Sequence, residues 1–159
     1  MAAYTYRMPS GIPGDVSRKS HSTIESHNMQ TPVAAFGVFA KMDTTTGNIV
    51  ALGSSDTADS VYGLVVRSYP TTSATNELGE AVPLKGVNDI LVRGYMTVKC
   101  NAGTAKKGGA VYVRIGATAT GKPIGGIEAA ADGANTIAVK ARFMHDADAS
   151  GNVEIAYNI

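Results

Sequence analysis

An apolar side chain recurs at every second position through the second half of the chain, and this period constrains the fold more than any other feature. From Ile90 to Lys99 one face is wholly apolar or glycine, and the other carries the charged residues. The stretches 111–115, 137–144 and 153–159 repeat the alternation, and glycine-bearing turns separate them. Such alternation is typical of strands with one buried and one wet face. The sequence predicts an all-β fold, either a small antiparallel β-barrel or a jelly-roll-like sandwich, with an extended N-terminal arm.

The middle of the chain carries the same signals in shorter form. Residues 36–42 alternate, the turn 43–48 follows, and 49–52 is apolar, which together predict a hairpin. Val61–Ser68 predicts a further strand, which Pro70 ends because proline cannot donate to a ladder.

A long polar connection, residues 70–88, separates this strand from the strongly alternating half. Connections of this length without structure of their own are usually functional or mobile, so 70–88 is a candidate contact loop. We expect the β-domain to span residues 33–159, with this loop inside it.

Residues 1–32 differ from the rest, because prolines and glycines at positions 9–14 oppose regular structure and 17–30 is polar. We interpret 1–32 as an extended arm that becomes ordered on a partner surface; the alternative is a disordered terminus. Several apolar residues favour a binding arm, since a purely solvating tail does not need them. They are Tyr4, Tyr6, Met8 and Ile12.

The alternation also predicts which side chains form the core. The expected buried residues are Val92, Met96, Val98, Val111, Val113, Ile137, Val139, Phe143, Val153 and Ile155. The residues expected to face water or a partner are Arg93, Tyr95, Arg114, Lys140 and Arg142. A shift of one residue in register would invert every assignment.

Composition limits the classes of protein that this chain can represent. With 44% hydrophobic and 17% charged residues and a net charge of +1, the chain can build a core and has no global field that attracts nucleic acid or membrane. One cysteine excludes an intrachain disulfide and fits assembly in a reducing cytoplasm. The N-terminus lacks the apolar core of a signal peptide, and no apolar run reaches membrane-spanning length.

No motif predicts catalysis, a metal or a cofactor. His21, His27 and His145 are not spaced with Cys100 as zinc ligands, and no Gly-x-Ser-x-Gly elbow is present. The glycine-rich stretch 116–126 lacks the Gly-Lys-Ser/Thr ending of a phosphate loop. Residues 146–152 match the first half of a calcium loop, but the position of the bidentate glutamate holds Tyr157, so an ordinary turn is favoured.

A single-strand nucleic-acid module remains an alternative by residue type. Basic side chains interleaved with tyrosines on sheet faces bind phosphates and stack bases, and near-neutral net charge argues against this use. A protein contact face explains the same residues, because tyrosine and arginine are enriched at interfaces. These residues are Arg93, Lys99, Arg114, Lys140, Arg142, Tyr95 and Tyr112.

Several sequence motifs, taken together in their order along the chain, are similar to those of the structural cement proteins of tailed bacteriophages. They extend over nearly the whole chain, as Gly11-Ile12-Pro13-Gly14-Asp15-Val16-Ser17-Arg18, Tyr62-Gly63-Leu64-Val65-Val66-Arg67-Ser68-Tyr69-Pro70, Val92-Arg93-Gly94-Tyr95-Met96-Thr97-Val98, Gly108-Gly109-Ala110-Val111-Tyr112-Val113-Arg114, Gly121-Lys122-Pro123-Ile124-Gly125-Gly126-Ile127-Glu128 and Gly151-Asn152-Val153-Glu154-Ile155-Ala156-Tyr157. The resemblance implies a β-rich virion protein without enzymatic activity or cofactor. It also implies a position on the outer capsid surface, clamped across adjacent subunits of the major capsid protein.

The resemblance places the binding on the arm from Tyr4 to Arg18 and on the 67–88 loop. We also expect a homo-oligomer, a dimer before a trimer, and no nucleic-acid or membrane partner. A host-surface or carbohydrate-binding decoration protein is the alternative, although tryptophan is absent. The candidate interface residues are Tyr4, Tyr6, Arg7, Met8, Ile12, Arg18, Arg67 and Tyr69.

Overall fold

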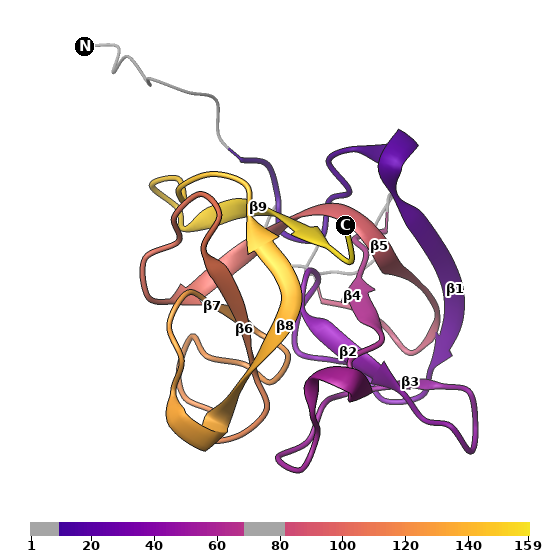
Figure 1. Cartoon of the computed structure of the whole chain (residues 1–159). Coiled ribbons are helices and arrows are strands. Elements are labelled where there is room, and N and C mark those ends of the chain that lie inside the picture. The colour runs from indigo at the N-terminus through magenta and orange to yellow at the C-terminus, as the bar shows by residue number, and fades with distance from the viewer. Residues whose placement is uncertain (1–9, 69–81) are drawn as a thin grey trace.

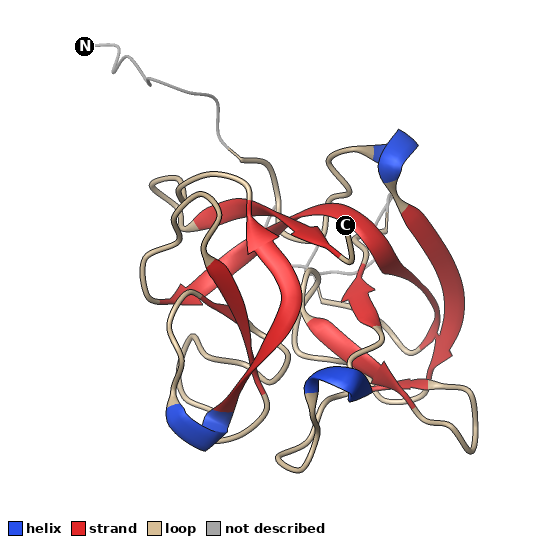
Figure 2. Cartoon of the chain, in the orientation of Figure 1, coloured by secondary structure: helices blue, strands red, loops and turns tan. Residues whose placement is uncertain are grey.

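A computed structural model of the chain describes residues 10–68 and 82–159, and these residues form an all-β structure, as predicted (Figure 2). The strands are β1 (Thr23–Met29), β2 (Phe39–Met42), β3 (Ile49–Val50), β4 (Gly63–Val65), β5 (Gly86–Ala102), β6 (Ala110–Arg114), β7 (Ile127–Glu128), β8 (Thr136–Phe143) and β9 (Asn152–Tyr157). The short 3-10 helices within these residues are η1 (Lys19–His21), η2 (Ala58–Ser60) and η3 (Gly133–Asn135). Among the described residues, no helix is long and apolar enough to cross a membrane.

The strand pairing closes on itself twice. One ring runs β1–β3–β2–β4–β5 and closes where β1 pairs with β5; the other runs β5–β7–β6–β8–β9 and closes where β9 pairs with β5. Figure 1 shows the two rings as neighbouring lobes, with β5 passing through both. The barrel form of the predicted fold is therefore confirmed. The prediction of a wholly antiparallel sheet is wrong, because β1–β3 and β5–β7 pair in parallel.

Strand β5 is the shared element, and its two halves serve different rings. Residues 86–93 pair with β1 and β4, and residues 94–102 pair with β9 and β7. Gly94 stands at the change of partners with φ +137°, and a Cβ there would overlap Ser22. Only glycine allows the chain to pass from one ring to the other at this point.

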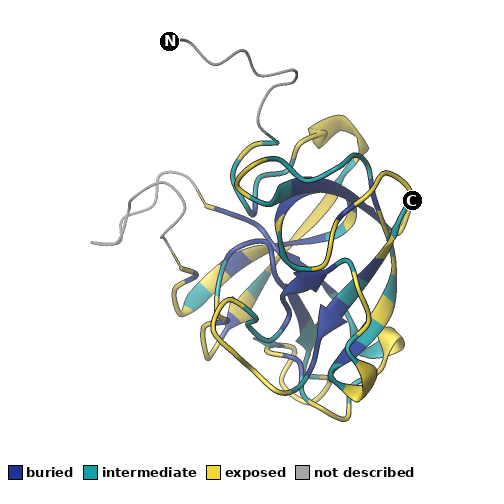
Figure 3. Cartoon of the chain, turned by 90° about the vertical axis from the view of Figure 1, so that its left-hand side faces the viewer, coloured by how far each residue is buried: buried dark blue, intermediate teal, exposed yellow. Residues whose placement is uncertain are grey.

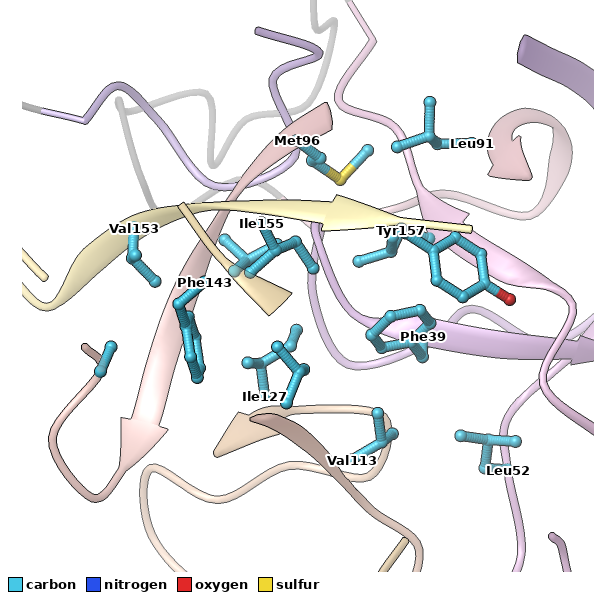
Figure 4. Close-up of a cluster of buried hydrophobic side chains, with 14 of the residues drawn as sticks. Phe39, Leu52, Leu91, Met96, Val113, Ile127, Phe143, Val153, Ile155 and Tyr157 are labelled. Carbon is cyan, nitrogen blue, oxygen red and sulfur yellow. The ribbon is translucent and has the colours of Figure 1, made fainter. Parts of the chain in front are cut away.

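The core has two parts because the strands between the rings are buried on both faces (Figure 3). On β2, Phe39 packs into the larger cluster and Ala40 into the smaller one; on β4, Leu64 and Val65 divide in the same way. Figure 4 shows the larger cluster, where Phe39 meets Tyr157 edge to face with ring centroids 5.1 Å apart. The predicted hairpin is confirmed as β2 and β3, but burial along 36–40 is continuous and not alternating.

Most of the predicted core is confirmed. The buried members are Met96, Val98, Val111, Val113, Phe143, Val153 and Ile155. Ile137 and Val139 are half-buried against the larger cluster, since alternate residues of β8 face solvent. Val92 is also half-buried, against the smaller cluster, so the burial predicted for Val92, Ile137 and Val139 is only partial. The pairing of β1 skips Val92, so it lies in a bulge between the pairs Thr23–Arg93 and Ile24–Leu91.

The segment interpreted as an arm is part of the fold wherever it is described, which corrects the predicted arm over residues 10–32. Thr23–Met29 forms β1, and Val16 forms a bridge with Met96 of β5. The sequence of β1 has no apolar period, and its first four residues are indeed all exposed. At the other predicted contact segment, β5 begins at Gly86, so residues 86–88 belong to a strand and not to the loop.

Candidate functional site

Residues 10–18 run across the joined rings through backbone hydrogen bonds. The amide of Gly14 donates to the carbonyl of Thr97 at 2.8 Å, and the amide of Arg67 donates to the carbonyl of Gly14 at 2.9 Å. Gly14 has φ +93°, and a Cβ there would lie 2.7 Å from that of Phe36. Ile12, a predicted interface residue, is half-buried in this segment. The segment is therefore held by the protein itself before any partner binds.

Arg18, another predicted interface residue, ends this segment in a paired state. Its Nε and Nη2 atoms donate to the two carboxylate oxygens of Glu154 at 3.0 and 2.8 Å, and its guanidinium lies 4.2 Å from the ring centre of Tyr95. Burial acts to raise the pKa of Glu154, but hydrogen bonds from Arg18 and Ser17 outweigh it and hold that pKa below its usual value. The ion pair fixes the segment to β9 and leaves the arginine half exposed.

Arg67 is the third described member of the predicted interface, and it is buried with 6% of its surface exposed. Its guanidinium carbon lies 5.4 Å from the centre of the Phe36 ring. The remaining candidates, Tyr4, Tyr6, Arg7, Met8 and Tyr69, lie outside the described residues.

Exposed apolar side chains around the start of β5 mark a surface within the predicted contact loop. Val82, Leu84 and Val87 are 43%, 53% and 76% exposed around the start of β5. Ile24 of β1 is 41% exposed, and the register places it on the same face as Val87. A signal was present in the sequence, because three large aliphatic residues in a polar connection have no core to enter. We call Val82, Leu84 and Val87 the apolar rim.

The basic residues considered for nucleic acid do not form one stripe. Arg93 and Lys99 are exposed on β5, and Lys140 and Arg142 are exposed on β8. In the sheet order β9 lies between these strands. Tyr95 is half-buried beneath an arginine, so its face is already occupied. Tyr95 is therefore not free to stack a base.

Arg114 is buried with 1% of its surface exposed, which corrects its predicted place on the wet face. Its Nε donates to buried Glu128 at 2.5 Å, and its Nη2 donates to Asp132 at 2.6 Å. Its Nη1 donates to the carbonyls of Gly116 and Ala117 at 3.1 Å each. The alternation failed here because the carboxylates that compensate the buried charge, Glu128 of β7 and Asp132 of the following loop, lie far from Arg114 in sequence.

A cluster of polar side chains joins β1 to the segment before β4. Tyr62 donates to the carboxylate of Glu25, and Nε2 of His27 lies 3.0 Å from the Tyr62 hydroxyl oxygen. Burial and the hydrogen bond to Glu25 raise the pKa of Tyr62 to about 12, so its hydroxyl stays protonated at neutral pH. The cluster is thus a structural hydrogen-bond network without an activated nucleophile.

An open hollow of about 620 Å³ lies nearby, between β2 and η2. It contains an ion pair between Lys41 and Asp56 at 2.8 Å, and Asp43 accepts hydrogen bonds from Thr45 and Thr46 of its own turn. Lys41, Asp56 and Asp43 are thus used within the fold, and Asp59 also lines the hollow.

The turn considered for calcium is also satisfied internally. Asp148 accepts from the amides of Ser150, Asn152 and Ser10, and Asp146 forms an ion pair with Lys106 at 2.6 Å. Among the described residues, no group of three or more histidine, cysteine, aspartate or glutamate side chains is placed to hold a metal.

Comparison with known proteins finds a matching family and a matching fold among solved structures. The profile of a protein family described as XM1 gp53 minor capsid protein matches residues 1–157. A chain in the solved capsid of Myoviridae phage XM1 has the same fold, with a TM-score of 0.71 and 18% sequence identity, over 98% of this chain and 95% of that one. No curated protein matches the chain.

Proposed function

The chain belongs to the XM1 gp53 minor capsid protein family, and from this premise we propose that it decorates the outer surface of a bacteriophage capsid and cements neighbouring subunits of the major capsid protein. The family is a structural one, so the chain is a virion protein and not an enzyme. The family match over 157 residues carries the proposal. Assembly takes place in the cytoplasm of the host bacterium.

The described surface supports a contact role. Ion pairs and buried cores make the joined rings rigid, and a rigid body loses little entropy on binding. The apolar rim is exposed on that body, where a partner can cover it. Residues 1–9, which contain Tyr4, Tyr6, Arg7 and Met8, supply the second contact. A decorating dimer that reaches two capsid sites also gains avidity without new contacts.

Binding to shells that lack the protein tests the proposal. Purified protein should co-sediment with such shells to a fixed saturating ratio and raise their resistance to heat. Leu84→Asp should weaken binding about tenfold, since it places a charge in a covered apolar contact. Ile159→Asp is the matched control, because Ile159 is similarly exposed at 48% but lies outside the apolar rim. Equal binding by both variants would exclude the rim.

The arm is tested by a truncation that leaves the hydrogen bonds of residues 10–18 in place. Because residues 10–18 hydrogen-bond to β5, removing 1–18 would damage the barrel itself. Removing 1–9 should leave thermal unfolding unchanged and weaken shell binding. If the truncated protein decorates shells normally, the arm is passive and the rim must carry the contact. Binding to DNA that falls steeply with salt, in place of shell binding, would favour the nucleic-acid alternative.

A further inference from the structure

The open hollow between β2 and η2 is large enough to receive side chains of another chain. Its volume of about 620 Å³ lies within the range of roughly 300–1,000 Å³ that is typical of ligand pockets. Half-buried apolar side chains form much of its wall, so part of their surface is not covered by the core. They are Met42, Val50, Val61 and Tyr62. The hollow therefore offers apolar contact to a segment that can enter it.

The hollow also carries negative charge that the fold does not neutralise. Lys41 and Asp56 pair with each other, which leaves Asp43 and Asp59. Hydrogen bonds from the Thr46 hydroxyl and a turn amide hold the pKa of Asp43 below its usual value, so this carboxylate is charged at neutral pH. In the described part of the chain, no cation forms an ion pair with either carboxylate. A fitting occupant combines apolar side chains with a cation.

Residues 1–9 have this combination. Arg7 lies between Tyr6 and Met8, so large side chains with apolar surface flank a positive charge on both sides. Tyrosine, methionine and arginine are also the residue types that are enriched at protein contacts. The chemistry of the segment is therefore complementary to that of the hollow.

The start of this segment lies far from the hollow of its own copy. The amide of Ser10 donates to Asp148, and its carbonyl accepts from the hydroxyl of Thr97, so residues 1–9 leave the protein beside β5 and β9. The hollow lies beside η2, toward the opposite end of the molecule (Figures 1 and 2). Nine extended residues span at most about 30 Å, and a path over the curved surface is longer than a straight line. The hollow of a neighbouring copy is not limited in this way.

We propose that residues 1–9 of one copy bind in the hollow between β2 and η2 of a second copy, with Arg7 facing Asp59 and Asp43. Two copies can exchange these segments reciprocally, which gives a closed dimer in which each contact occurs twice. Ordering the segment costs entropy, so the contact in solution should be weak. On a shell, neighbouring copies are held at high local concentration, and the contact then becomes occupied.

The inference rests on the proposed function and deepens it, because it names the surface through which decorating copies join each other. The contact that residues 1–9 supply is then made to a neighbouring copy. Loss of the segment weakens shell binding because it breaks the links between copies.

Charge reversal in the full chain tests the contact. Wild type should associate with rising concentration in sedimentation, and Arg7→Glu and Asp59→Lys should each abolish this, because like charges then meet. Mixed in equal amounts, the two variants should associate at least about tenfold more tightly than either alone, since each segment then meets an opposite charge. Asp89→Lys is the matched control, because it changes the net charge equally at an exposed position outside the hollow.

Three results would overturn the proposal. The first is association of a folded Asp59→Lys as tight as that of wild type, and the second is failure of the mixture to associate. The third is an equal loss of association in Asp89→Lys, because the effect would then come from net charge and not from the hollow. Thermal unfolding checks that each variant is folded, and Asp59→Asn, which only removes the charge, should weaken association less than Asp59→Lys.

Disulfide formation locates the segment in a Cys100→Ser background. Protein with Thr5→Cys is mixed with protein with Thr44→Cys, whose position lines the hollow. A second mixture uses Ala149→Cys, an exposed position outside the hollow. On oxidation, the first mixture should give about tenfold more mixed dimer than the second, because only there are the thiols held within bonding distance. Equal yields would indicate random collision and overturn the proposal.

A chain that carries both Thr5→Cys and Thr44→Cys identifies the copy that supplies the segment. We expect disulfides between copies; an intrachain disulfide in their place would assign the hollow to the segment of the same copy and overturn the exchange. Shell binding is measured on the same proteins. Binding by monomeric Asp59→Lys would leave the cementing role intact, whereas wild type that associates without binding shells would exclude cementing and keep the exchange. The two proposals can therefore fail separately.

Discussion

Replacing Arg114 by methionine should destabilise the protein by about 4 kcal/mol, because the change leaves a buried carboxylate without its partner. Arg114 and Glu128 have 1% and 2% of their side-chain surfaces exposed, and their atoms lie 2.5 Å apart. Loss of the second ion pair adds little, since Asp132 is 46% exposed. The carbonyls of Gly116 and Ala117 would also lose their donor.

Denaturant unfolding followed by far-UV circular dichroism measures this cost, with Arg114→Lys and the double variant Arg114→Met/Glu128→Leu as comparisons. Lysine keeps the charge but cannot reach all the acceptors at once, so it should lose roughly half as much. The double variant should be more stable than Arg114→Met alone, because it removes the unpaired charge. A cost below about 1 kcal/mol for Arg114→Met, or additive effects in the double variant, would refute the reasoning.

Three smaller perturbations test other parts of the fold. Glu154→Gln should lower the free energy of unfolding by about 1–2 kcal/mol at pH 7. Because folding lowers the pKa of Glu154, the carboxylate stabilises the protein above its unfolded pKa, and this stabilisation is lost as pH falls through the folded pKa. In urea melts, the difference between the variant and wild type should therefore vanish in acid. Gly14→Ala should lower stability by about 2–3 kcal/mol, because φ is +93° and Phe36 blocks the Cβ; normal melting would contradict this. Phe143→Ala should cost about 3–5 kcal/mol by leaving a cavity, and a cost under 1 kcal/mol would mean that the core collapses around the site.

The strands that the sequence predicted well are those with one wet face. β8 alternates between half-buried and exposed positions along its length, and β6 places Val111 and Val113 in the core as the pattern indicated. The period fails at β2 and β4, which lie between the rings. Phe39 and Ala40 are adjacent and both buried, because each faces a different core, and no local pattern distinguishes this from a single buried face.

The errors share a physical origin in contacts between residues far apart in sequence. The polar sequence of β1 indicated an arm, yet its backbone pairs with β5 and completes a ring. Arg114 alternates correctly with its neighbours but is drawn inside by Glu128 and Asp132. Of the candidate interface residues, Arg18 and Arg67 have side chains that the fold itself uses, against Glu154 and Phe36.

The shared strand explains how a small protein can transmit load between its contacts. β5 hydrogen-bonds to β1 and β4 in one ring and to β7 and β9 in the other, so this one strand belongs to both rings and joins them. Residues 10–18 attach next to Thr97 in its second half, whereas the apolar rim lies around its start. A force between residues 10–18 and the apolar rim would therefore pass along β5. That geometry suits a protein whose proposed task is to keep neighbouring subunits from separating.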